Sequence, residues 1–218
     1  MKNKNNSDVL YRKLMVIAEN ICAETKWLYV NYEILIAADK EEVSDKFINT
    51  YAGNVWNALR RSLLNETLIG ISKLIIDKKD NPSSFHSLHE LLRKQGVLEI
   101  IKLNYTQAES EFQNRHKELL NGLLRLEEYL KTHDVVKSLV RHRNNYLVHR
   151  SQKVSSKTEN LKWGDEKILI EIVSEIIHPM ELLILNVGNI SNSTRSIYKA
   201  YAENFWNGFE PNDEKFSW

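Results

Sequence analysis

The chain has 218 residues, 42% of them hydrophobic and 27% charged, and its formal net charge is +1. This is the balance of an ordinary globular protein rather than a disordered one, and a charge so near zero names no class of partner. A single cysteine, Cys22, excludes an internal disulfide framework and a CxxC-type metal site. The polar N-terminus does not read as a signal peptide, and no long apolar run predicts a transmembrane helix, so we expect a cytoplasmic protein.

Helical periodicity dominates the first half of the chain. The seven glycines and three prolines leave few turn-forming residues, which favours long helices over short strands. We expect a first helix over 8–38 and a second helical region over 41–77, within which Gly53 marks a bend or a close contact. The polar segment 77–82 ends that region, and Ser83 or Ser84 caps the next helix.

The second half of the chain continues the helical pattern. A short apolar segment covers 97–103, and the spacing Thr106-x-x-Glu109 is typical of a capping box that opens a helix. Asp134 is expected to cap a helix that runs through His149, and a polar loop follows over 151–164. Asp165 caps a last helix, to about residue 204, that Pro179 should kink because proline lacks the amide hydrogen. The predicted fold is all-α, an antiparallel bundle of long helices with a kinked C-terminal helix.

The helix expected before the polar loop carries the feature that points to chemistry. Val136, Val140, Arg143 and Leu147 share one face, so Arg143 stands where an apolar residue is expected. An unpaired buried guanidinium is very costly, so Arg143 must be paired, reach a cleft or lie at a subunit interface. His149 lies near the end of this helix, where the helix dipole favours the charged imidazole.

The surroundings of this helix are basic. From Lys137 to Lys162 there are seven Lys or Arg residues against one acid, Glu159. This local excess suits a polyanion such as RNA. The Arg-to-His spacing alone is not specific, and the alternative is an arginine salt-bridged inside the bundle with a surface histidine near a helix end.

Two stretches of the sequence resemble a known family. Arg143-Asn144-x4-His149 resembles the R-polar-x4-H signature of the HEPN superfamily. The segment 57–77, followed by the short helix 87–92, is similar to the abortive-infection U-type (AbiU2-like) branch, in which a long helix ends in a small-x-Leu-x-x-Asp turn. The resemblance covers about 55–155. This chain has Lys73 and Asn144 where that branch often has Arg and Asp.

The resemblance implies a metal-independent endoribonuclease of toxin or phage-defence type, with no cofactor. Its catalytic residues would be Arg143, His149 and Asn144, in a composite cleft shared by the two protomers of a homodimer. Cleavage would pass through a 2′,3′-cyclic phosphate. An antitoxin or a regulatory protein is a further expected partner. The RNA would be held by neighbouring side chains, namely Arg141, His142, Asn145, Tyr146, Arg150 and Lys153.

We expect one helical domain over 1–218, with a HEPN-like core at about 55–155 and the helices 8–38 and 165–204 packed on it. A rival hypothesis is a non-catalytic helical dimer that binds nucleic acid or a protein partner, because some HEPN domains are scaffolds of that kind. A helical metalloenzyme is disfavoured, because the chain lacks clustered Glu-x-x-His spacings on two helices. His86 and His89 alone form a weak metal pair, and a surface helix is the favoured interpretation.

Overall fold

The computed structural model describes residues 2–48, 50–77, 81–144, 161–188 and 190–209, with side chains from residue 8 onward. The regular structure within these ranges is helical, which confirms the all-α prediction. The helices, in chain order, are α1 (Lys2–Ala38), α2 (Glu41–Phe47), α3 (Ala52–Ile75), α4 (Phe85–Leu92), α5 (Val97–Asn104), α6 (Glu109–Thr132), α7 (Asp134–His142), α8 (Asp165–Ile184) and α9 (Ile190–Gly208).

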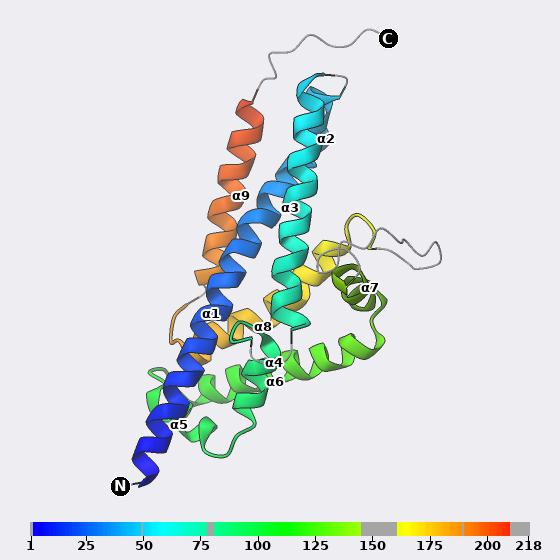
Figure 1. Ribbon diagram of the computed structural model, residues 1–218. Helices are drawn as coiled ribbons and strands as arrows, with labels where there is room; N and C mark the ends of the chain where they lie inside the picture. The colour runs from blue at the N-terminus through cyan, green and yellow to red at the C-terminus, as the bar shows by residue number, and fades with distance from the viewer. Residues whose placement is uncertain (1, 49, 78–80, 145–160, 189, 210–218) are drawn as a thin grey trace.

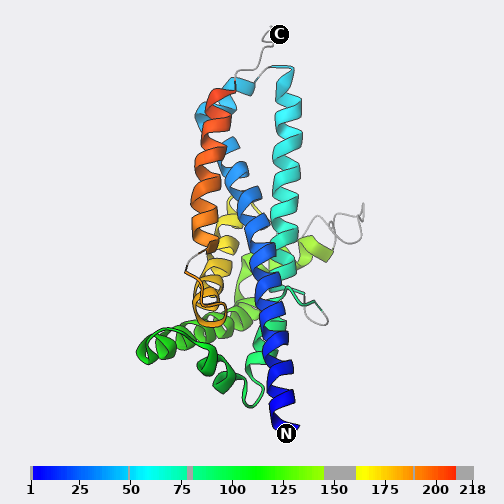
Figure 2. The ribbon, with the colours of Figure 1, turned by 90° about the vertical axis from the view of Figure 1, so that its left-hand side faces the viewer.

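The long helix α1 is the axis of the molecule and packs on both α3 and α9 (Figure 1). Helix α3 runs antiparallel to α1, and the short α2 joins them at one end. Helix α9 runs in the same direction as α1 (Figure 2), so successive contacts advance along both helices, as in the ion pairs Glu33–Arg195 and Lys40–Glu203. Helices α6 and α8 pack together beside this layer, and α7 lies against α3 and α8.

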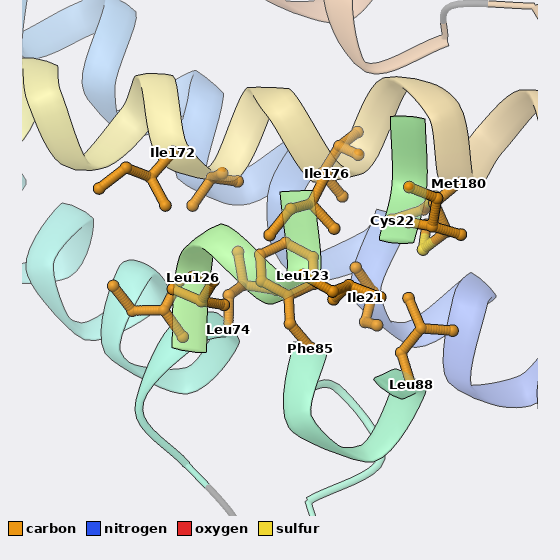
Figure 3. Close-up of a cluster of buried hydrophobic side chains, with 14 of the residues drawn as sticks. Ile21, Cys22, Leu74, Phe85, Leu88, Leu123, Leu126, Ile172, Ile176 and Met180 are labelled. Atoms are coloured by element: carbon orange, nitrogen blue, oxygen red, sulfur yellow. The ribbon is translucent and has the colours of Figure 1, made fainter. Parts of the chain in front are cut away.

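One large hydrophobic core joins α1 to the helices α3 through α8. Figure 3 shows the part of it that lies between α1, α3, α4, α6 and α8. On α1 its residues Leu14, Ile21 and Leu28 follow a seven-residue spacing, and each is at most 1% exposed. A second, smaller cluster lies where α2 meets α3 and α9, with Phe47 stacked on Trp56 at 5.6 Å between ring centroids. The large cluster joins α1 to α3, and the smaller one joins both of them to the end of α9.

The region expected to be helical over 41–77 is two helices, with a break between Phe47 and Ala52. Gly53 lies just after this break, and a Cβ atom built there would stand 2.6 Å from the Phe47 carbonyl oxygen. The expectation of a close contact at Gly53 is therefore confirmed. The chain reverses here because only a glycine lets the start of α3 approach the end of α2 so closely.

The predicted helix caps were partly wrong. Ser84 does cap α4, its Oγ accepting a hydrogen bond from the Ser87 amide at 3.2 Å. The capping box at Thr106 is wrong, because the Thr106 amide donates to Asn186 Oδ1 at 3.1 Å and α6 begins after Ala108. Asp134 is not a cap but the first residue of α7, whose N-cap is His133. At Thr106 the local sequence signal loses to a partner from a distant part of the chain.

Asp165 and the helix it opens also differ from expectation. Gly164, at φ 98°, is the N-cap of α8, and Asp165 instead accepts a bond from the Lys162 amide at 2.7 Å. The single kinked helix expected over 165–204 is two helices. Helix α8 continues through the buried Pro179 to Ile184, and Asn186, at φ 52°, lies in the turn before α9. The break lets α9 turn back along α1.

Candidate active site

The predicted site residues divide into two groups. Arg141, His142, Arg143 and Asn144 lie within the described residues at the end of α7. The predictions for Asn145, Tyr146, Leu147, His149, Arg150 and Lys153 fall outside the described residues. The described part of the site is therefore the arginine half of the motif.

Helix α7 presents Arg143 at the edge of the core. Val136 on the same face is fully buried and Val140 is half-buried, while the Arg143 side chain is 31% exposed. The regular α-helix ends at His142, and Arg143 and Asn144 continue in a π-helical turn. Such wider turns change the phase of the helix and occur often at functional sites. The Arg143 side chain is therefore only partly buried.

The guanidinium of Arg143 is held by the end of α3. Its Nη2 donates to Asp77 Oδ1 in an ion pair between residues 66 positions apart. Its Nη1 donates to the neighbouring Asn144 Oδ1 at 3.4 Å. A guanidinium has five N–H donors, and Asp77 and Asn144 are the acceptors that Arg143 has among the described residues. The remaining donors can face an anion.

The carboxylate of Asp77 is itself held from its other side. Asn81 Nδ2 donates to Asp77 Oδ2 at 3.2 Å and lies 3.4 Å from the Lys73 carbonyl oxygen. Asn81 Oδ1 accepts from the Ser83 amide at 2.9 Å, which fixes the amide side chain in the turn before α4. The end of α3, the turn before α4 and the end of α7 therefore converge on one polar cluster.

Arg141 and His142, predicted as RNA contacts, are both half-buried. Burial lowers the pKa of His142 below its ordinary value of 6.5. The neutral imidazole is therefore favoured near neutral pH.

A groove opens between α1 and α4 on one side of this cluster. It encloses about 630 Å³, and Asn81 contributes to its wall. Three exposed cations, Arg12, Lys13 and Lys94, line it against one acid, Glu90, and none of the three forms an ion pair with another described residue. Its floor is apolar, formed by Val16, Ile17 and Leu91. A groove of this size and composition suits an anionic ligand with a flat, apolar part.

Asp77 and Asn81 were not among the predicted site residues. Asp77 entered only as the end of a family-like turn, and Asn81 only as part of a helix breaker. One signal was available for Asp77: it lies two residues beyond the end of α3, where the helix carbonyls disfavour a negative charge. An acid in such a position needs a cation, and Arg143 is that cation.

Arg60, on α3, is an arginine with a different use. Arg60 pairs with Asp39, and its guanidinium lies 4.4 Å from the ring of Trp56 and 4.9 Å from that of Trp163. Both ring contacts and the carboxylate tie together the ends of α1, α3 and the segment before α8. Arg60 is a structural residue, whereas no aromatic ring covers Arg143 among the described residues.

The histidine pair on α4 does not converge. His89 is buried, with its Nδ1 2.9 Å from Glu127 Oε1, whereas His86 is exposed in the groove. The surface-helix interpretation is therefore wrong for His89 and holds for His86. In the described ranges, no group of three or more His, Cys, Asp or Glu residues is arranged to hold a metal ion.

The described part of the chain is wholly helical, and one of its short helices ends in a partly exposed arginine beside a basic segment. This fold and this site together define a class of protein. The family comparison agrees. A family model described as HEPN_AbiU2 (AbiU2) matches residues 12–205, so the chain belongs to the AbiU2 family of abortive-infection HEPN domains. The match extends beyond the stretch 55–155 at both ends and takes in α8 and most of α9. Neither a search of curated proteins nor one of solved structures gave a match.

In the part of the chain that the structure describes, no helix has the length and apolar character needed to cross a membrane.

Proposed function

We propose that this protein is an endoribonuclease of HEPN type, in which Arg143, Asn144 and His149 act on RNA without a metal ion. The observation that carries the proposal is the setting of Arg143. It lies at the end of α7 in a π-helical turn, is 31% exposed, and is anchored by Asp77, with Asn144 as its other acceptor among the described residues. A guanidinium fixed in this way can bind a phosphate with its remaining donors.

The chemistry follows from the residue types. His149 takes the proton of the ribose 2′-hydroxyl, or gives a proton to the leaving 5′-oxygen, because imidazole titrates near neutral pH. The 2′-oxygen forms a bond to phosphorus as the bond to the 5′-oxygen breaks, which leaves a 2′,3′-cyclic phosphate. Arg143 stabilises the extra negative charge in the transition state, and Asn144 orients Arg143 through their 3.4 Å contact.

RNA binding would extend beyond the reacting phosphate. Arg141 and His142 lie beside Arg143, and the proposal adds Asn145, Tyr146, Arg150 and Lys153 from the basic segment. The cationic groove between α1 and α4 supports the proposal, because its wall includes Asn81, which contacts Asp77. The strand would place its phosphates on the groove cations and a base on its apolar floor.

HEPN domains often act as dimers, and we propose that two copies bring their motifs into one composite cleft. A dimer would place a second Arg143 and a second His149 near the same phosphate. Light scattering of the purified protein should then give twice the 25.5 kDa mass of the chain, and a monomer at all concentrations would contradict the composite cleft.

Cleavage in the presence of EDTA tests the proposed reaction. Wild-type protein should cut a structured RNA and leave 2′,3′-cyclic phosphate ends, and His149→Ala or Arg143→Ala should cut it at least about 100-fold more slowly. No cleavage by the wild type, or equal cleavage by His149→Ala, would contradict the proposal.

A second candidate function is a non-catalytic dimeric module that binds nucleic acid or a protein such as an antitoxin. The Asp77–Arg143 ion pair favours it, because it gives Arg143 a structural partner within the chain. Expression in a bacterial host separates the two candidates. Growth arrest by wild type that Arg143→Ala and His149→Ala relieve supports the ribonuclease, and unchanged arrest by the variants supports the module.

A further inference from the structure

Asp77 lies at the end of α3, where the helix dipole disfavours a negative charge. Asp77 follows the last helical residue, Ile75, by two positions, so its carboxylate lies near carbonyl groups at the negative end of the helix dipole. Its amide still donates to the Ser72 carbonyl oxygen at 3.2 Å, which keeps Asp77 close to that end. A charge held in this position needs a specific favourable partner.

The partners of Asp77 are arranged on its two oxygens separately. Oδ1 accepts from Arg143 Nη2, and Oδ2 accepts from Asn81 Nδ2 at 3.2 Å. Because Asn81 is fixed in turn by the Ser83 amide at 2.9 Å, the carboxylate cannot rotate freely about its side-chain bonds. The side chain of Asp77 is 23% exposed, so water competes with this arrangement only in part.

The effect on Arg143 is directional. Its guanidinium is planar, and a bond from Nη2 to a fixed carboxylate sets both the position and the plane of the group. Without that bond, a long side chain following a π-helical turn would sample several rotamers. A phosphate would then have to order the side chain as it binds, at an entropic cost.

We propose that Asp77 is a positioning residue that, backed by Asn81, holds Arg143 in the orientation needed to contact the RNA phosphate. This inference rests on the proposed ribonuclease function but assigns a role to two residues outside the Arg-to-His motif. Asp77 itself touches no substrate. It acts through Arg143, and Asn81 acts through Asp77.

Kinetics on full-length variants test the positioning role. Asp77→Ala should lower kcat by about 10- to 100-fold with little change in KM, and Asn81→Ala should have a smaller effect in the same direction. Asp77→Asn, which keeps an acceptor but loses the charge, should fall between wild type and Asp77→Ala. In an Arg143→Lys background the same Asp77→Ala change should cost less than about threefold, because the group it positions is already altered.

Asp134→Ala is the matched control. Asp134 also pairs with a cation on α7, Lys137 at 3.5 Å, but its side chain is 81% exposed and it lies at the opposite end of the helix. Its removal should leave kcat, KM and melting temperature unchanged. If Asp77→Ala lowers the melting temperature and reduces activity by the same factor in wild-type and Arg143→Lys backgrounds, its role is structural and the inference fails.

A second readout keeps the positioning claim separate from the reaction. In protein labelled with ¹⁵N-arginine, the side-chain Nε–H signal of Arg143 should be narrow and shifted in wild type, and should move to the position of a mobile arginine in Asp77→Ala. An inactive wild type with this spectral change overturns the ribonuclease proposal but leaves the positioning intact. An unchanged Arg143 signal, or full activity of Asp77→Ala, overturns the positioning.

Discussion

At the residue scale, two arginines show how similar side chains take different roles. Arg60 and Arg143 each bond to an aspartate near a helix end. Trp56 and Trp163 also contact the guanidinium of Arg60, so its hydrogen-bonding edge and its faces are used within the fold. Arg143 is 31% exposed and, among the described residues, bonds only to Asp77 and Asn144. The difference lies in the neighbours and not in the residue type.

The contacts of Arg60 predict that its mutation lowers stability. Arg60→Ala should lower the free energy of unfolding by about 2 kcal/mol, because it leaves Asp39, whose side chain is 12% exposed, without its cation. Burial already raises the pKa of Asp39, which shows that its charged form is costly there. The neighbouring, exposed Arg61 is the control, and Arg61→Ala should change stability by less than about 0.5 kcal/mol.

Urea denaturation of the two variants gives this comparison directly. Equal stability of the Arg60→Ala and Arg61→Ala proteins would show that the Arg60 cluster contributes nothing to the fold.

At the element scale, the groove between α1 and α4 is the surface proposed to bind RNA beyond the motif. Its cations come from two helices that meet only in the folded chain: Arg12 and Lys13 from α1, and Lys94 from just after α4. Asn81 connects its wall to the Asp77–Arg143 pair. An RNA strand bound at Arg143 would therefore have a cationic path along α1.

Charge reversal in the groove should weaken RNA binding. We expect Arg12→Glu combined with Lys94→Glu to raise the Kd for a 2′-O-methylated, non-cleavable RNA by at least about tenfold at 0.1 M salt, and by less at higher salt. Lys167→Glu, an exposed lysine of α8 outside the groove, is the control. Fluorescence anisotropy measures both. Equal affinities of the groove variant and the control would exclude the groove as an RNA path.

Much of the element arrangement was predictable from local pattern, and the departures have a common cause. The helix expected over 8–38 is α1, which ends at Ala38 as predicted, because helical periodicity depends only on local pattern. The Thr106 cap failed because Asn186, 80 residues away, takes its hydrogen bonds.

The candidate site was likewise predictable only in part. The position of Arg143 on an apolar face predicted that it is paired or reaches a cleft, and it is both paired and partly exposed. The identity of its partner was not predictable, because Asp77 is 66 residues away and the contact arises only when α7 packs against α3. The role of Asn81 was still harder to predict, because Asn81 contacts Asp77 and not a residue of the Arg-to-His motif.

At the scale of the whole molecule, buried histidines make stability depend on pH. His89 is 5% exposed, and burial lowers its pKa below 6.5 although Glu127 opposes this. Arg93 lowers the pKa further, and Glu90 raises it. The unfolded chain therefore binds a proton to His89 more readily than the folded protein. The stability that depends on neutral His89 is present above about pH 6.5 and is lost as pH falls.

The wild-type protein should accordingly lose stability between pH 7.5 and 5.5, and His89→Gln, which keeps a donor for Glu127, should lose less. The difference between the two proteins in the fall of melting temperature should be about 2 to 4 °C. Parallel melting curves of the two proteins across this range would show that His89 does not titrate with folding.

The proposed ribonuclease function depends on Arg143 acting on a ribose-linked phosphate. The most direct measurement compares two substrates of one sequence, all-ribose RNA and its 2′-O-methylated form, with wild type and Arg143→Ala in EDTA. We predict that wild type cleaves the all-ribose RNA alone, leaving 2′,3′-cyclic phosphate ends, and that Arg143→Ala cleaves neither at a comparable rate. Cleavage of both substrates by wild type, or equal cleavage by Arg143→Ala, would contradict the account.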